Sequence, residues 1–279
     1  MISNFGYNNN LFILPFDHRS SFVKLFGFTN LGFEEKNYIK SAKQLIYEAF
    51  KKAVTQDIPK DQAAILIDEE YGDEILKDAI NQGFITALTT EKSGQEGFNF
   101  EYGEEFAQHI EKYRPTFVKA LIRYQPHSNW TNLKLLSDHC HMHGYKFLLE
   151  MLMEPNVPNA QNILPAIIDL RDNGLEPDVW KLEGMENKND YKLIVAKIQE
   201  EERQNVGLVI LGSGESKEKV EQWIITGRNI KGVIGFAVGR TVFSRPLIDY
   251  KDGKVSKEKA IEDISSNFQN LYKLFISQN

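Results

Sequence analysis

Three charged side chains lie inside short apolar runs of the sequence, where a solvated charge is not expected. Lys119, Glu150 and Lys181 each have apolar neighbours on both sides. Removing a charge from water is costly, so such a group is either paired with an opposite charge or used in chemistry. Desolvation and a second ammonium group both favour the uncharged amine of a lysine, which can attack a ketone to form a Schiff base. Buried salt bridges, such as Lys181 with Glu150, are the alternative, and these residues alone do not decide between the two.

Two glycine-rich turns follow other apolar runs and predict an anion site. They are Gly212-Ser213-Gly214 and Gly239-Arg240. Backbone N–H groups of such a turn at the start of a helix bind phosphate, and an arginine adds a bidentate contact. A tight turn is the alternative for Gly-Ser-Gly on its own. The segment GSGESK does not fit the dinucleotide fingerprint GxGxxG, because its sixth residue is lysine.

Other ionisable groups follow the apolar runs and complete the predicted site. We expect Asp17 to lie at this site, with Arg19, Lys92 and Arg123 as candidates to bind the substrate. His18, between Asp17 and Arg19, is a further candidate, with a role as a loop anchor as the alternative. Strand ends are solvated and often charged whatever the function, which explains the acidic run after the second apolar segment.

The cluster 139-HCHMH-143 raises the question of a metal site. His139 and His143 are four residues apart and share one face of a predicted helix, whereas Cys140 and His141 point elsewhere. The segment ends a helix on the outside of the fold, far from the strand ends, so we predict a solvated helix end rather than a zinc site. We expect neither a metal nor a cofactor.

The elements that must position these residues alternate along the chain. Eight short apolar runs predict strands at residues 11–16, 63–67, 85–90, 117–124, 146–152, 179–183, 207–212 and 233–239. Segments of helical period lie at 36–54, 72–81, 104–113, 130–144, 161–174, 188–203, 216–227 and 256–276. Eight strands, each followed by a helix, predict an α/β fold, a single (β/α)8 TIM barrel. Continuous apolar strands fit a parallel sheet that is covered on both faces.

Barrel geometry would bring the charged residues to one end. Side chains alternate along a strand, so Lys119 and Arg123 share one face, and Lys181 and Glu183 share another. If these faces point inward, two lysines and Glu150 converge at the C-terminal strand ends, where active sites of this fold lie. The two glycine-rich turns follow the seventh and eighth strands, which is the usual phosphate site of the fold.

The pattern predicts one domain over residues 1–279, because no linker, composition break or low-complexity tract divides it. Residues 17–35 form a long connection after the first strand and contain several phenylalanines. A short extra helix, a lid and local packing are the three interpretations of this stretch.

Composition excludes several classes of function. The formal net charge of the 279 residues is −6 and no basic stripe occurs, which argues against nucleic acid as a partner. A single cysteine, Cys140, rules out an intrachain disulfide and fits a reducing cytoplasm. The N-terminus lacks the features of a signal peptide, and no apolar run approaches membrane-spanning length. We expect a cytoplasmic protein with a small-molecule partner, as a monomer or a homo-oligomer.

Several motifs together resemble a known enzyme superfamily. The motifs are Asp17-x-Arg19, LIDEEYG at 66–72, EKSG at 91–94, VKALIRY at 118–124, FLLE at 147–150, VWKLEG at 179–184 and GFAVGRT at 235–241. They resemble the class I tagatose-bisphosphate and sulfofructose-phosphate aldolases. The chain is more similar still to the aldolase-like C-terminal domain fused to the inositol-catabolism kinase 5-dehydro-2-deoxygluconokinase, where PFDHR, EKSGQ, FEYG, PTFVK, EPDVWK and GFAVGRT look nearly the same.

The resemblance implies a role for each matching residue. By it, the Schiff-base lysine is Lys181, the acid/base glutamate is Glu150, the second active-site lysine is Lys119, the active-site aspartate is Asp17, and Ser213 and Arg240 contact the phosphate. His18 departs from the glutamine of the tagatose enzymes, and the loop after the first strand also differs.

The resemblance also implies a reaction. It points to a class I aldolase that cleaves 6-phospho-5-dehydro-2-deoxygluconate to dihydroxyacetone phosphate and malonate semialdehyde in myo-inositol catabolism. The sequence has no counterpart of the kinase domain, so we expect any kinase step to belong to another protein. The alternatives are a tagatose-bisphosphate-type or other sugar-phosphate aldolase, a metal-dependent aldolase that uses histidines, and a non-catalytic barrel that binds a sugar phosphate.

Overall fold

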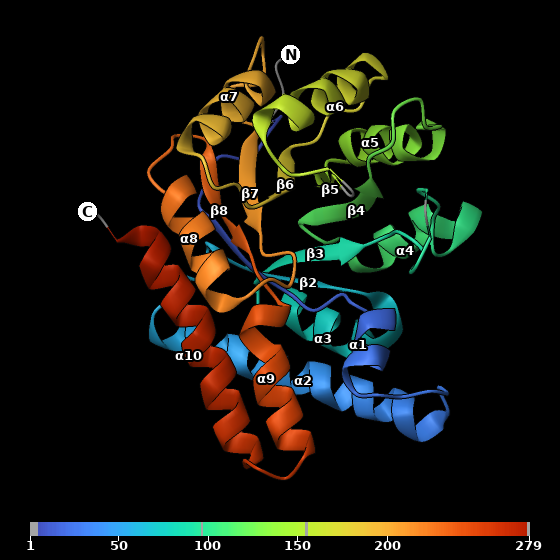
Figure 1. The fold of residues 1–279 in the computed structure, drawn as a ribbon. Coiled ribbons are helices and arrows are strands. Elements are labelled where there is room, and N and C mark those ends of the chain that lie inside the picture. The colour runs from blue at the N-terminus through green and yellow to red at the C-terminus, as the bar shows by residue number, and fades with distance from the viewer. Residues whose placement is uncertain (1–4, 96, 154–155, 278–279) are drawn as a thin grey trace.

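Eight parallel strands form a closed barrel at the centre of the molecule (Figure 1). The computed structural model describes residues 5–95, 97–153 and 156–277. The strands pair in chain order, and β1 closes the ring against β8. Their bounds are β1 (Leu11–Pro15), β2 (Ala63–Ile67), β3 (Ile85–Thr89), β4 (Phe117–Arg123), β5 (Lys146–Leu152), β6 (Val179–Glu183), β7 (Gly207–Leu211) and β8 (Val233–Ala237). The predicted (β/α)8 TIM barrel is confirmed.

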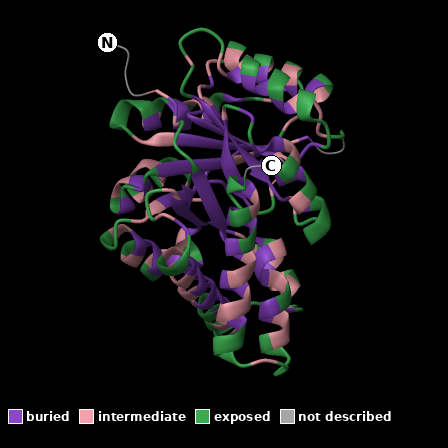
Figure 2. Cartoon of the chain, turned by 90° about the vertical axis from the view of Figure 1, so that its left-hand side faces the viewer, coloured by how far each residue is buried: buried purple, intermediate pink, exposed green. Residues whose placement is uncertain are grey.

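Helices surround the strands and present a mixed exposed and half-buried surface, while the strands are buried (Figure 2). The helices are α1 (Ser20–Leu25), α2 (Phe33–Gln56), α3 (Glu69–Asn81), α4 (Phe106–Tyr113), α5 (Thr131–His143), α6 (Ala160–Asp172), α7 (Lys188–Ile198), α8 (Lys217–Gly227), α9 (Arg240–Lys251) and α10 (Lys257–Ile276). A 3-10 turn, η1 (Gly103–Glu105), precedes α4. Each predicted helix has a counterpart, with ends that differ by a few residues.

Two helices add to the predicted set. Helix α9 follows β8 directly, where no helix was predicted. Its buried Phe243 and Leu247 have helical spacing, but Pro246 lies inside the helix, and proline usually breaks a helix because it removes a backbone donor. Helix α1 lies within the long connection after β1. Of the three interpretations of residues 17–35, a short extra helix is therefore the correct one for part of the stretch. Phe22 of α1 stacks on Phe243, with 5.4 Å between ring centroids.

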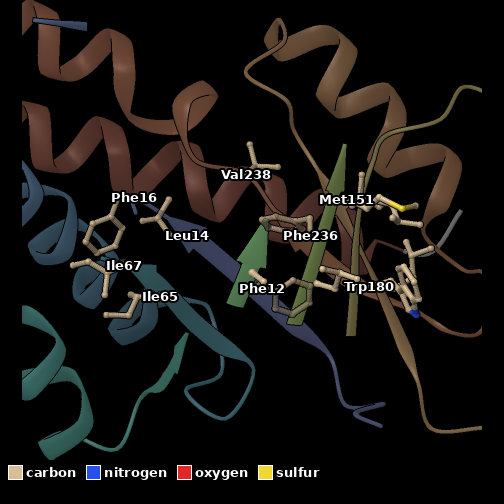
Figure 3. Close-up of a cluster of buried hydrophobic side chains, with 14 of the residues drawn as sticks. Phe12, Leu14, Phe16, Ile65, Ile67, Met151, Trp180, Phe236 and Val238 are labelled. Atoms are coloured by element: carbon tan, nitrogen blue, oxygen red, sulfur yellow. The ribbon is translucent and has the colours of Figure 1, made fainter. Parts of the chain in front are cut away.

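Side chains alternate along each strand between the barrel interior and the surrounding helices. The outward set includes Phe12, Trp180 and Phe236 (Figure 3), and Phe12 meets Phe275 of α10 edge-on. The inward set fills the barrel with apolar side chains, namely Leu11, Ile13, Ala64, Leu66, Ala87, Phe117, Leu148, Val179, Val209, Ile234 and Ala237. Burying each large side chain of this kind contributes roughly 1.5–3 kcal/mol. Inward residues beyond this apolar plug therefore lie at the C-terminal strand ends.

The opposite end of the barrel is tied together by Asp178, which is fully buried just before β6. Its carboxylate accepts hydrogen bonds from the backbone N–H groups of Gly6 (2.7 Å) and Phe147 (2.8 Å). It also lies 3.1 Å from Nζ of Lys146 and 3.2 Å from Nε2 of His141. Burial raises the pKa of Asp178, but these hydrogen bonds and charges outweigh it and lower the pKa below its ordinary value.

The histidine cluster lies at the C-terminal end of α5, at the same end of the barrel as Asp178. The rings of His139 and His143 lie 4.4 Å apart, and Nδ1 of His143 is 3.9 Å from Glu111. Across residues 5–95, 97–153 and 156–277, no three histidine, cysteine, aspartate or glutamate side chains form a group that could hold a metal ion. None of the helices in these ranges is both long and apolar enough to cross a membrane.

Candidate active site

Lys119, Glu150 and Lys181 project from β4, β5 and β6 into a pocket of about 380 Å³ at the C-terminal end of the barrel. Strand pairing places Glu150 directly beside Lys181. The three residues are 1%, 6% and 2% exposed. Nζ of Lys181 donates to Oε2 of Glu150 at 2.8 Å, and Nζ of Lys119 lies 3.0 Å from the same oxygen. The structure therefore brings these three predicted residues together.

Lys119 is surrounded by carboxylates. Its Nζ lies 3.0 Å from Oδ2 of Asp17, 2.5 Å from Oε1 of Glu91 and 3.4 Å from Oγ1 of Thr89, in addition to its contact with Glu150. Burial lowers the pKa of Lys119, but the negative charges of Asp17, Glu150 and Glu91 outweigh it and raise the pKa above its ordinary value. Lys119 is therefore held as an ammonium ion.

The same charges act on the carboxylates. Burial raises the pKa of Asp17, but the charges of Lys119, His18 and Lys181 outweigh it and lower the pKa below its ordinary value. Burial also raises the pKa of Glu150, and Lys119 and Lys181 again reverse the shift to a lower pKa. Both groups are ionised at neutral pH.

Lys181 has fewer partners than Lys119. Among the described residues its ion-pair partner is Glu150 alone, and its side chain lines the open pocket. Lys181 can give its proton to Glu150 and turn toward a ligand with the loss of one contact. Lys119 would have to break contacts with three carboxylates to do the same. The number of ion-pair contacts thus distinguishes Lys181 from Lys119, whereas the neighbouring residues in the sequence did not.

Glu91 is a site residue that sequence reasoning left out. It follows β3, is 7% exposed, and accepts hydrogen bonds from Thr89 and Lys119 on Oε1. The sequence did carry a signal, because Glu91 is two residues after Thr89 and so shares its face of the strand. Its place at a strand end made solvation the simpler interpretation, and the fold excludes that interpretation because Glu91 is buried.

The predicted anion site lies on the other side of the pocket. Gly212, Ser213 and Gly214 follow β7, and α9 begins at Arg240 with Gly239 as its N-cap. The N-cap residue Gly239 offers no side-chain acceptor to the first backbone N–H groups of this helix, and Gly239, Arg240 and Thr241 line the pocket. A helix N-terminus and a glycine turn together form an anion-binding arrangement.

The turn at residues 212–214 packs closely against Arg240. Nη2 of Arg240 donates to the backbone carbonyl of Ser213 at 2.7 Å. Gly214 has φ +78°, and a Cβ there would lie 2.4 Å from Cζ of Arg240. Ser213 donates through Oγ to Oε1 of Glu183 at 3.1 Å, while the backbone N–H of Met153 donates to Oε2 of Glu183 at 3.0 Å. Arg240 and Glu183 therefore hold the turn from two sides.

The remaining predicted residues lie around the mouth of the pocket. Arg19 donates from Nη1 to Glu101 and from Nη2 to the carbonyl oxygen of Glu91, both at 2.6 Å, so it holds the loop after β3. Lys92 and Arg123 are exposed and line the pocket on the side of β3 and β4. Positive charges thus occur at both ends of the pocket, with the lysine and carboxylate cluster between them.

His18 lies between the cluster and the anion site. Its Nδ1 is 4.0 Å from Oδ1 of Asp17 and accepts or donates no hydrogen bond among the described residues. Burial lowers the pKa of His18, Asp17 opposes this, and Arg240 and Lys181 add to it, so the pKa falls to about 4. The imidazole is neutral at physiological pH.

A sequence model of the family described as "Uncharacterized protein conserved in bacteria (DUF2090)" matches residues 4–279. The chain belongs to the DUF2090 family. No curated protein sequence matches this DUF2090 chain significantly.

Solved structures similar to the DUF2090 chain include aldolases. A fructose-bisphosphate aldolase from Plasmodium falciparum is 14% identical, with a TM-score of 0.67 over 94% of this chain and 89% of that one. The YdjI aldolase from Escherichia coli K12 is 11% identical, with a TM-score of 0.57 over 97% and 92% of the two chains. A Corynebacterium glutamicum protein is 17% identical, with a TM-score of 0.56 over 96% and 88%. At these identities the likeness establishes the barrel fold.

Proposed function

We propose that the protein is a class I aldolase, which cleaves a phosphorylated keto sugar or keto sugar acid through a Schiff base on Lys181. The observation that carries the proposal is the pair of buried lysines on either side of Glu150. One lysine is held by three carboxylates, and the other has one carboxylate at 2.8 Å and an open pocket beside it. The aldolases among the similar structures add support at the level of the fold.

Glu150 prepares Lys181 for attack. Lys181 passes a proton to Oε2 of Glu150 across 2.8 Å, and the free amine attacks the substrate ketone to form a carbinolamine. Glu150 then returns the proton to the carbinolamine oxygen, which leaves as water, and the nitrogen lone pair forms the iminium. The proton count is conserved, because Glu150 ends the step ionised as it began.

The iminium draws electrons from the bond that breaks. A carboxylate of the cluster removes the proton from the hydroxyl β to the iminium, and the carbon–carbon bond then breaks to leave an enamine. Reprotonation and hydrolysis of the enamine release the ketone product and return Lys181. Lys119 keeps its charge throughout, since its pKa is raised, and it hydrogen-bonds a substrate oxygen while offsetting the surrounding carboxylates.

The anion site orients the substrate. A phosphate bound by the turn around Gly214, the start of α9 and Arg240 would position the ketone over Lys181 of the neighbouring β6. The other end of the substrate would then reach Lys92 and Arg123 on the far side of the pocket. Two cationic ends suit a substrate with a phosphate at one end and an acid group at the other.

The substrate that fits this pattern and the motif resemblance is 6-phospho-5-dehydro-2-deoxygluconate, a keto sugar acid with a phosphate. Its cleavage would give dihydroxyacetone phosphate and malonate semialdehyde, as a step of myo-inositol catabolism. A tagatose-bisphosphate-type substrate is the second candidate, because Lys92 and Arg123 also suit a second phosphate.

Borohydride reduction tests the proposal. Reduction in the presence of dihydroxyacetone phosphate or a candidate sugar phosphate should give a covalent adduct, seen by intact mass and mapped to the peptide that contains Lys181. Lys181→Met should abolish the adduct, whereas Lys119→Met should slow its formation without moving it. An adduct on Lys119 or Lys92 would contradict the assignment.

Treatment with EDTA provides a second test, because Schiff-base chemistry needs no metal ion. Activity should survive the chelator. Absence of any adduct with these compounds, together with loss of a measured activity in EDTA, would refute the class I mechanism and favour a metal-dependent one.

A further inference from the structure

Glu91 has one carboxylate oxygen that the rest of the described chain leaves unused. Oε1 accepts hydrogen bonds from Oγ1 of Thr89 at 2.7 Å and from Nζ of Lys119 at 2.5 Å. Oε2 is buried and accepts a hydrogen bond from no described residue. Glu91 is 7% exposed and lines the pocket. Buried polar atoms are nearly always satisfied, so an unsatisfied oxygen beside a pocket points to a donor on a ligand.

The position of Glu91 in the ring of strands identifies the part of the substrate that it would meet. Glu91 follows β3, which lies across the closed barrel from β7 and its anion-binding turn. A substrate with its phosphate at Arg240 and its ketone over Lys181 extends its remaining carbons toward β3 and β4. Asp17 follows β1, which is paired with β8, and so lies nearer the anion site.

Glu150 lies on the other side of the scissile bond, next to the lysine that forms the Schiff base. It contacts Lys181 at 2.8 Å, within reach of the amine and of the carbinolamine oxygen. The hydroxyl that must lose a proton lies beyond the scissile bond, on the carbons that point away from the phosphate. Given the Schiff-base function proposed above, we propose that Glu91 is the catalytic base that removes this hydroxyl proton.

The proposed step balances. In cleavage, Oε2 of Glu91 accepts the hydroxyl proton, and the electron pair of the O–H bond becomes the second bond of the aldehyde carbonyl. The carbon–carbon bond breaks, its electron pair forms the enamine double bond, and the iminium nitrogen becomes neutral. In the direction of addition, Glu91 returns the proton to the new alkoxide. Lys119, bound to the other oxygen of Glu91, holds the carboxylate in place in both directions.

Dihydroxyacetone phosphate separates the two proton-transfer tasks. Exchange of its carbon-bound hydrogen with D2O requires the Schiff base and enamine on Lys181 but no base at the hydroxyl of a second product. We expect Glu91→Gln to keep this exchange and borohydride trapping close to wild-type rates. Cleavage by the same variant should fall by about 10²–10⁴-fold, the range typical of general acid–base catalysis.

Cleavage is measured with whichever of 6-phospho-5-dehydro-2-deoxygluconate, tagatose 1,6-bisphosphate and fructose 1,6-bisphosphate the wild type turns over. Glu91→Asp, which keeps the carboxylate, should recover part of the lost rate. Glu104→Gln removes an exposed carboxylate from the turn that follows the same loop, and should behave as the wild type.

Three results would overturn the role of Glu91. Equal losses of exchange, trapping and cleavage in Glu91→Gln would mean that Glu91 acts only by positioning Lys119. Cleavage at the wild-type rate would remove Glu91 from the mechanism. Separation of cleavage from exchange by Asp17→Asn instead would assign the step to Asp17. Failure of the wild type to trap dihydroxyacetone phosphate at all is a different outcome, since it tells against the Schiff-base function itself.

Discussion

At the scale of the residue, the surroundings of the two buried lysines separate their roles. A single carboxylate 3.0 Å from an ammonium contributes about 5 kcal/mol of attraction at an effective dielectric constant of about 20, before desolvation is subtracted. Lys119 has three such neighbours and Lys181 has one. The lysine with one neighbour is the one that can lose its proton and act as a nucleophile.

Glu150→Gln should separate folding from chemistry. The amide keeps the size of the side chain and a hydrogen-bond acceptor for Lys181, so the barrel should remain folded by circular dichroism. Proton transfer is lost, and we expect turnover to fall by about 10²–10⁴-fold while a Schiff base still forms slowly. Single-turnover trapping with borohydride measures the second effect. Turnover within a few-fold of the wild type would remove Glu150 from the mechanism and leave Asp17 as the next candidate.

Arg240→Ala should mainly weaken substrate binding. The loss of a charge-assisted contact to phosphate costs on the order of 2 kcal/mol, which corresponds to a KM roughly 30-fold higher. Arg245→Ala is the matched control, because Arg245 is on the same helix, 79% exposed, and paired with Asp249. Steady-state kinetics with a phosphorylated substrate measure both variants. An unchanged KM in Arg240→Ala would show that Arg240 does not contact the phosphate.

The sequence was sufficient to predict that Lys119, Glu150 and Lys181 converge, because apolar neighbours and alternation along a strand are local properties. It was insufficient for Glu91 and for the contacts of Arg19. Those depend on how the loop after β3 folds back, where Glu91 bridges to Phe100 and Arg19 bonds to Glu101. Contacts between residues so far apart in the chain leave no periodic pattern.

At the scale of the element, the strands were easier to predict than helices α1 and α9. Each strand is a short apolar run with turns at both ends, so its bounds agree with the sequence to within two residues. Helix α9 has an internal proline and starts without a side-chain cap. The sequence of α9 therefore lacks two marks by which a helix is predicted, namely a proline-free interior and a capping side chain at its start. The uncapped start is also what makes the helix suitable for binding an anion.

Gly214→Ala should damage the anion site without unfolding the barrel. The added Cβ would lie 2.4 Å from Cζ of Arg240, so the guanidinium must move. Gly253→Ala is the control, because Gly253 has φ +69° but nothing within 4 Å of an added Cβ. Both variants bear the strain of the left-handed conformation, about 1–2 kcal/mol. We expect similar losses of Tm but a raised KM in Gly214→Ala alone; equal KM values would contradict the predicted site.

At the scale of the whole molecule, His18 should make stability depend on pH. Its pKa is about 4 in the folded protein and about 6.5 in an unfolded chain. Between these values the unfolded chain binds a proton that the folded protein does not. The free energy of unfolding should therefore fall as pH drops from about 6.5 toward 4, by at most about 1.4 kcal/mol per pH unit.

Denaturant titrations of the wild type and of His18→Gln across this range measure the effect. The variant should show a flatter dependence, whereas His127→Gln, on an exposed loop, should follow the wild type. Equal slopes for the wild type and His18→Gln would mean that His18 titrates alike in both states.

The network around Asp178 matters for laboratory evolution of this protein. Asp178 joins Gly6, Phe147 and His141 at one end of the barrel, and an apolar plug separates it from the pocket at the other end. The partners of Asp178 and the residues that line the pocket are therefore different sets. A library at Lys92, an exposed residue of the pocket, can explore new substrates without changing the contacts of Asp178, so the residues of that network should survive selection unchanged.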